Sequence, residues 1–135
     1  MVQENAEIEE LRSVEVHRTV LRAFFKIAQA WNLKASEQCA LLGVSNATCN
    51  RFRKDQVNAP LAPDKLERLA YILNIYAALN VLLPVQERAD AWVRERSTAA
   101  LFGGESALRR MLGGLVGDLK VVADYLDAAQ SGDFA

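Results

Sequence analysis

The polar side chains between Ser45 and Lys54 have the types and the spacing that recognise DNA. The stretch GVSNATCNRFRK begins at Gly43 and ends with three basic residues among its last four. Hydroxyl, amide and guanidinium groups on one short helix suit the edges of bases in the major groove and the phosphate oxygens. We therefore predict a DNA-binding surface on this helix. Its predicted residues are Ser45, Asn46, Thr48, Asn50, Arg51, Arg53 and Lys54.

The same stretch meets the requirements of a helix-turn-helix. Its first helix offers a small residue, Cys39 or Ala40, to the second helix, and Gly43 tolerates the positive φ of the turn. Arg53 and Lys54 are candidates for phosphate contacts. The candidates for base edges are Asn46, Thr48, Asn50 and Arg51. The alternative is a structural helix corner with a solvated polar face. Inward positions of the second helix are Val44, Ala47 or Thr48, Cys49 and Phe52.

The charge of the chain is distributed unevenly around this stretch. The net charge is −1, but residues 1–17 carry five Glu and one Arg, which gives −4. Residues 18–54 carry seven basic side chains and one Glu, which gives +6, and residues 55–135 carry the remaining −3. A basic block that coincides with the polar helix favours binding to phosphates, whereas a block of solvated charge is the simpler alternative.

Few residues are available for catalysis or metal binding. His17 is the only histidine, and Cys39 and Cys49 are the only cysteines. These are too few ligands for a zinc site and too few partners for a catalytic triad. The glycine-rich stretches LFGGES and LGGLVGD lack the lysine of a phosphate-binding loop. We expect no enzyme activity, no cofactor and no metal. The two cysteines fit positions for small buried residues, with a redox role as the less favoured alternative.

Hydrophobic periodicity predicts an all-α fold. Expected helices cover about residues 14–31, 46–54, 63–81 and 118–130. Shorter helices are expected after a Ser36 cap, over residues 106–112 and from Pro84 onward. We expect an acidic segment at 1–17, a helix-turn-helix domain at 18–83 and a second helical domain at 84–135. The apolar runs are too short to cross a membrane and the acidic N-terminus does not resemble a signal peptide, which predicts a cytoplasmic protein.

With these features in place, the chain resembles the Xre-type antitoxins of RES–Xre toxin–antitoxin modules, which share a C-terminal toxin-binding domain with the MbcA and ParS antitoxins. The N-terminal half is similar in SEQCALLGVSNATCNRFRKD and KLERLAYILNIYAAL. The C-terminal half is similar in Trp92, ALFGG at 100–104, ALRRMLGG at 107–114 and LKVVADYLDAAQSG at 119–132.

The resemblance implies a protein with two binding activities. The C-terminal domain would bind and block a cognate toxin, which in RES modules degrades NAD, and the helix-turn-helix would repress the operon as a homodimer on operator DNA. Toxin blockade requires exposed apolar anchors. Trp92, Phe102 and Leu112 could instead simply close the small C-terminal core. The toxin-binding candidates are Trp92, Leu101, Phe102, Tyr125, Leu126 and Phe134.

Two other functions remain open at the level of sequence. One is a stand-alone helix-turn-helix regulator whose C-terminal half dimerises or binds a small molecule, and a folded apolar pocket in that half would favour it. The other is a protein-interaction module whose helix-turn-helix no longer binds DNA. Steep salt dependence of duplex binding would reject the second, because neutralised phosphates release counterions.

Overall fold

The chain folds into helices throughout the part that the structure describes. The computed structural model describes residues 2–132, which contain no β-strand; Arg96 and Ser106 form one isolated antiparallel bridge. The predicted all-α fold is therefore confirmed. No described helix is both long and apolar enough to cross a membrane. The elements are α1 (Val2–Ala30), α2 (Ala35–Leu42), α3 (Asn46–Arg53), α4 (Pro63–Leu82), α5 (Gln86–Ala91), η1 (Trp92–Arg94), η2 (Ala100–Phe102), α6 (Ala107–Met111) and α7 (Val116–Gln130).

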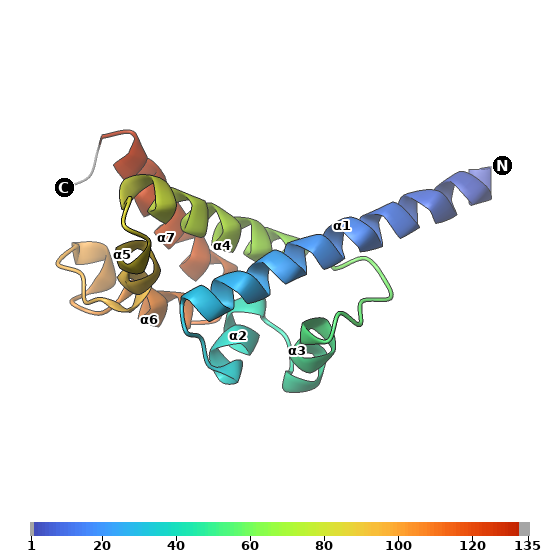
Figure 1. Ribbon diagram of the computed structural model, residues 1–135, viewed down its shortest axis with the longest axis horizontal. Helices are drawn as coiled ribbons and strands as arrows, with labels where there is room; N and C mark the ends of the chain where they lie inside the picture. The colour runs from blue at the N-terminus through green and yellow to red at the C-terminus, as the bar shows by residue number, and fades with distance from the viewer. Residues whose placement is uncertain (1, 133–135) are drawn as a thin grey trace.

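Helix α1 is long and only its C-terminal part joins the body of the protein. Its apolar positions Leu21, Phe24 and Ala28 are buried on one face, as the three/four spacing predicts. Residues 3–12 are exposed on every side, and this part of the helix projects away from the other helices (Figure 1). The acidic N-terminal segment is thus helical from Val2 onward and continuous with α1.

Helices α2 and α3 form the expected pair around a glycine turn, and both lie beneath α1 in Figure 1. Gly43 ends α2 with φ +67°, a left-handed conformation that favours glycine. The prediction that Ser36 caps α2 is wrong, because Lys34 occupies the cap position. The backbone N–H of Lys34 donates to a carboxylate oxygen of Glu37 at 2.8 Å, which fixes the start of the helix two residues earlier.

Helices α4 and α7 run side by side in the same direction and make the most extensive helix–helix contact in the described chain (Figure 1). Pro63 is the first residue of α4, as predicted. Helix α7 begins at Val116, before the expected Asp118, because the Asp118 carboxylate accepts the backbone N–H of Leu115 at 3.1 Å. Similarly, α5 begins at Gln86, two residues after the predicted Pro84.

One hydrophobic core connects the two halves of the chain. It extends from Leu21 on α1 through Leu41 on α2 and Ile72 on α4 to Leu119 and Leu126 on α7. Because α4 contacts α1 and α2 as well as α5 and α7, it belongs structurally to both halves. The helix-turn-helix is therefore supported by the same core that holds the C-terminal helices.

Candidate functional site

The start of α3 presents most of the predicted DNA-binding residues to solvent. Asn46, Asn50, Arg51 and Lys54 are exposed. Ser45 has a different role, since its hydroxyl oxygen accepts the backbone N–H of Thr48 at 3.2 Å and caps the helix.

The hydroxyl of Thr48 connects this cap to a cation one turn later. It lies 3.1 Å from the Ser45 hydroxyl and accepts a hydrogen bond from the guanidinium of Arg51 at 3.1 Å. These contacts hold Arg51 over the first turn of α3. Around α3 the described structure therefore presents one half-buried hydroxyl, two exposed amides and two exposed cations, with Thr48 and Arg51 on the side of α4.

Arg53 is held by several groups of the protein itself. Its guanidinium donates to the side-chain oxygen of Gln38 at 2.8 Å and also bonds the side chain of Asn50. It lies 5.7 Å above the ring centroid of Phe25 on α1, a cation–π contact. Arg53 thus joins α3 to α1 and α2, and a phosphate at this position would have to share its hydrogen-bond donors.

Two cations of the basic block are neutralised inside the domain. Arg22 forms an ion pair with Asp55 at 2.8 Å, and Arg18 donates to the backbone oxygen of Asp55 at 3.1 Å. The hydrogen bond from Arg22 lowers the pKa of the Asp55 carboxyl, although desolvation opposes this shift. Asp55 directly follows Lys54, which caps the end of α3, and it has φ +64°. Its contacts with Arg18 and Arg22 therefore fasten α3 to α1.

A shallow cleft lies beside the exposed face of α3. Its volume is about 470 Å³, and Ser45, Thr48 and Arg51 line it from α3. Lys65, at the start of α4, lines the other side and donates to the backbone oxygen of Gly43 at 2.6 Å. Sequence reasoning did not select Lys65, because it lies 22 residues from its acceptor and carries no local motif.

Arginines that the sequence analysis missed hold both ends of α2. Arg94 on η1 donates to the backbone oxygens of Trp31 at 2.9 Å and Asn32 at 2.7 Å, and pairs with Glu37 at 3.0 Å. Burial disfavours the charged form of Glu37, but the Lys34 N–H and Arg94 outweigh it and lower the pKa of its carboxyl. The C-terminal half thereby fixes the start of the first helix of the pair.

Arg68 holds the other end of α2. This buried side chain donates to the backbone oxygen of Gly114 at 2.6 Å and lies 3.4 Å from that of Leu41. Among residues 2–132 its hydrogen bonds run to these carbonyl oxygens, and, after the larger effect of Lys65, its charge also lowers the pKa of the Asp64 carboxyl. Arg68 therefore links the helix-turn-helix to the loop before α7.

The toxin-binding candidates gather around an aromatic cluster in the C-terminal half. The rings of Trp92 and Tyr125 are stacked with centroids 6.3 Å apart, and Phe102 meets both edge-on at 6.1 Å and 5.3 Å. Trp92 and Tyr125 are half-buried, whereas Phe102 is buried. Leu101, beside Phe102 on η2, is exposed.

The remaining two candidates lie elsewhere. Leu126 is buried between α7 and α4 with 1% of its surface exposed, so it supports the surface from below. Phe134 lies outside the described residues. The structure thus brings three candidates into contact, Trp92, Phe102 and Tyr125, and places exposed Leu101 next to Phe102 in the chain.

An apolar slot opens next to the aromatic cluster. Its volume is about 230 Å³, and its walls are Leu79, Leu82, Leu83, Trp92 and Leu126. Small-molecule pockets are usually roughly 300–1,000 Å³. The slot therefore has the size of one large side chain rather than of a drug-sized ligand.

The described residues offer no grouping suited to a metal ion. No three His, Cys, Asp or Glu side chains among them lie close enough together to hold one.

Comparison with known proteins gives a family match for each half of the chain. The family model for the antitoxin Xre-like helix-turn-helix domain matches residues 10–74. The model for the antitoxin Xre/MbcA/ParS C-terminal toxin-binding domain matches residues 78–132. Uncharacterized protein y4oB of Sinorhizobium fredii (strain NBRC 101917 / NGR234) is 43% identical over 112 residues, which cover 83% of this chain and 84% of that protein. No solved structure matches the chain.

Both halves of the sequence-based interpretation thus meet in one family. The helix-turn-helix model covers α2 and α3 with their exposed polar face. The toxin-binding model covers the aromatic cluster and all of α7. The chain belongs to the Xre-type antitoxins, in which a helix-turn-helix domain is joined to an Xre/MbcA/ParS toxin-binding domain.

Proposed function

We propose that this protein neutralises a cognate toxin through residues 84–135 and represses its own operon through the helix-turn-helix within residues 18–83. The observation that carries the proposal is the pairing of a DNA-reading helix with a toxin-binding module on one shared core. The toxin is a RES-domain protein that degrades NAD. The antitoxin acts in the cytoplasm by binding and not by catalysis.

The proposed toxin-binding surface is centred on Leu101, with Trp92 and Tyr125 beside it. An exposed leucine adjoins Phe102, whose ring contacts the half-buried rings of Trp92 and Tyr125, and such apolar groups resemble the anchors that dominate many protein interfaces. The neighbouring slot would receive one apolar side chain of the toxin. Its small volume gives no support to the alternative of a regulator that binds a small molecule.

Operator binding would use the exposed face of α3. Asn46, Asn50 and Arg51 would meet base edges, and Lys54 would meet phosphates, as would Lys65 from the far side of the cleft. One such helix makes few contacts, and a two-fold pair doubles them on a palindromic site. We therefore propose a homodimer.

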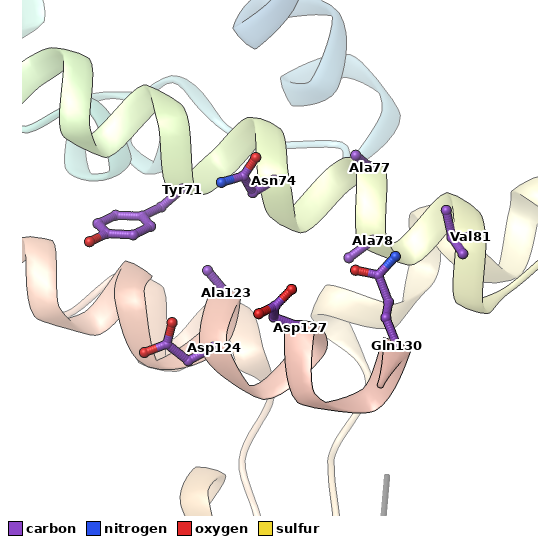
Figure 2. A pocket seen from close by; sticks show the side chains of 9 residues that line it. All are labelled: Tyr71, Asn74, Ala77, Ala78, Val81, Ala123, Asp124, Asp127 and Gln130. Carbon is purple, nitrogen blue, oxygen red and sulfur yellow. The ribbon is translucent and has the colours of Figure 1, made fainter. Parts of the chain in front are cut away.

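Helix α4 offers a surface for this dimer. Figure 2 shows the groove of about 360 Å³ between α4 and α7, with Ala77 and Ala78 on α4 opposite Ala123 and Asp127 on α7. Val81, which is 67% exposed, lies at the end of the groove. Small side chains allow close approach of another helix, so a second copy of α4 could pack there. Ala77→Arg would then convert the dimer to a monomer in light scattering.

The antitoxin activity is tested by co-expression with the protein encoded beside it. Removal of residues 115–135 is a poor test, because it deletes the buried residues Leu119, Val122 and Leu126 and would unfold the core. Leu101→Asp leaves the core intact and places a charge on the proposed surface. Val16→Asp, on an exposed position of α1, is the matched control.

We expect the wild type and the Val16→Asp variant to protect cells and to co-purify with the toxin. Leu101→Asp should lose both properties while its circular dichroism spectrum and melting temperature stay unchanged. A toxic neighbour that binds the Leu101→Asp variant normally would move the interface elsewhere. A harmless neighbour that binds neither form would contradict the antitoxin function.

A further inference from the structure

The only two cysteines of the chain meet at the interface of the helix-turn-helix. Cys49 on α3 is completely buried, and Cys39 on α2 packs against the same core from a half-buried position. The Cys39 sulfur contacts the side chain of Asn46, which lies one helical turn before Cys49 on α3, and the Cys39 and Cys49 thiols are within hydrogen-bonding reach of each other. Because they belong to different helices, a covalent bond between them would lock the helix pair.

Each thiol also contacts a predicted DNA-binding residue. The Cys39 thiol donates to the side-chain oxygen of Asn46 at 3.1 Å, at the first residue of α3. The guanidinium of Arg53 donates to the sulfur of Cys49 at 3.4 Å. Oxidation of the two sulfurs would therefore change the contacts that hold Asn46 and Arg53 on α3.

We propose that Cys39 and Cys49 form a reversible disulfide in the presence of a hydroperoxide, and that this oxidation weakens DNA binding by releasing Asn46. Disulfide formation concerns the chain alone and is tested without DNA. The weakening of DNA binding rests on the proposed DNA-binding function.

The reaction balances with hydrogen peroxide as the oxidant. The Cys39 thiolate attacks one peroxide oxygen, the O–O bond breaks, and Cys39 becomes a sulfenic acid while the leaving hydroxide takes a proton to form water. The Cys49 sulfur then attacks the Cys39 sulfur and displaces the hydroxyl group as a second water. Two thiols and one peroxide thus give one disulfide and two waters, and the two sulfurs supply both electrons.

The positions of the sulfurs assign their roles. Cys39 is the one that solvent can reach, so it meets the oxidant, and buried Cys49 resolves the sulfenic acid. Burial and the adjacent Cys39 thiol raise the pKa of Cys49 to about 11, with Arg53 opposing the shift. Since the thiolate is the nucleophile, ring closure should accelerate as pH rises towards that pKa.

Oxidation changes the contacts of Asn46 in a definite way. A disulfide has no S–H group, so the side-chain oxygen of Asn46 loses the donor that holds it. The amide can then rotate away from the orientation in which it is presented on α3. We therefore expect oxidised protein to bind its operator less tightly than reduced protein does.

The disulfide is tested by mass spectrometry of the full-length protein. No Lys or Arg lies between the cysteines, so trypsin releases both in one peptide, residues 35–51. After peroxide treatment this peptide should be lighter by two hydrogens and should regain them with a thiol reductant. Chymotrypsin, which cuts after Leu41 or Leu42, should instead give two peptides joined by the bond. Cys39→Ser and Cys49→Ala, each with a single thiol, should show neither change.

Oxidised protein that stays folded but keeps both thiols reactive towards a maleimide would overturn the disulfide, as would cross-links formed only between chains.

The weakening of DNA binding is tested with a duplex from the region upstream of the protein's own gene. Oxidation should lower the affinity of the wild type severalfold, and a thiol reductant should restore it. Cys39→Ser, which keeps a hydroxyl near Asn46, should be insensitive. Equal affinity in both redox states would overturn the release of Asn46, whereas no binding even when reduced would contradict the proposed DNA-binding function instead.

Discussion

The guanidinium of Arg68 occupies the space that a side chain on Gly43 would need. A Cβ atom added to Gly43 would lie 2.7 Å from both Cζ and Nε of Arg68. Gly43 also has φ +67°, which side chains disfavour. The turn glycine of the helix-turn-helix is thus required both by its backbone conformation and by an arginine that reaches from α4 to the C-terminal half.

We predict that Gly43→Ala lowers the free energy of unfolding by about 2–4 kcal/mol, since backbone strain and displacement of a buried cation add together. Gly103→Ala is the matched control. Gly103 has φ +57° but nothing within 4 Å of an added Cβ, so only the backbone cost of about 1 kcal/mol applies. Urea unfolding of the two variants measures both values. Equal losses would show that Arg68 moves aside without cost.

The Glu37–Arg94 contact predicts a pH-dependent contribution to stability. The pKa of Glu37 is lowered on folding, so its stabilisation is present above the unfolded pKa and is lost as pH falls through the folded value. Glu37→Gln should lower the free energy of unfolding by about 1–2 kcal/mol at pH 7. The difference from wild type should shrink as pH falls below the ordinary glutamate pKa of about 4.3 and should be lost once pH passes below the lowered folded pKa. Urea unfolding between pH 3 and pH 7 measures it, with Glu9→Gln on the exposed part of α1 as control.

DNA binding should depend on salt in a residue-specific way. Removal of one phosphate contact lowers the slope of log affinity against log salt by about 1. We expect this change for Lys54→Ala and for Lys65→Ala, measured by fluorescence anisotropy with the upstream duplex. Arg51→Ala should also lose discrimination between operator and unrelated DNA. Lys120→Ala, whose lysine pairs with Asp124 on α7, should leave both quantities unchanged.

The projecting part of α1 should contribute nothing to the stability of a single chain. Residues 3–12 are exposed on all sides, so deletion of residues 2–12 should change the free energy of unfolding by less than about 0.5 kcal/mol. The deletion removes four Glu and one Arg. Affinity for DNA should therefore rise at low salt, because acidic charge near the duplex is repulsive. A large loss of stability would show that this segment is covered in solution.

Local signals predicted the helix-turn-helix well. Gly43 ends α2, Ser45 caps α3 and Pro63 starts α4, because each of these residues acts on the backbone of its own turn. Errors at helix starts have the same origin. Glu37 and Asp118 each lie inside a helix, three residues after its cap. Each carboxylate accepts the backbone N–H of that cap residue, and this contact sets a helix start that the sequence prediction placed too late.

Contacts between distant residues could not be predicted in the same way. Arg68 and Gly114 are 46 residues apart, and Arg94 and Trp31 are 63 apart, so no periodicity connects them. The surface proposed for the toxin has the same limit. The sequence pattern of α7 predicts an apolar stripe, but it does not identify the helix that packs against that stripe. Leu126, predicted as a toxin contact, lies in the core against α4.

The parallel packing of α4 and α7 also has a kinetic meaning. Tyr71 and Ala123 line one groove although they are roughly fifty residues apart, whereas α2 and α3 are neighbours in the chain. Closing so long a loop costs entropy before its contacts compensate. The local contacts between α2 and α3 can therefore form before α7 packs against α4. The shared core and the contacts of Arg68 and Arg94, which complete both halves, form later.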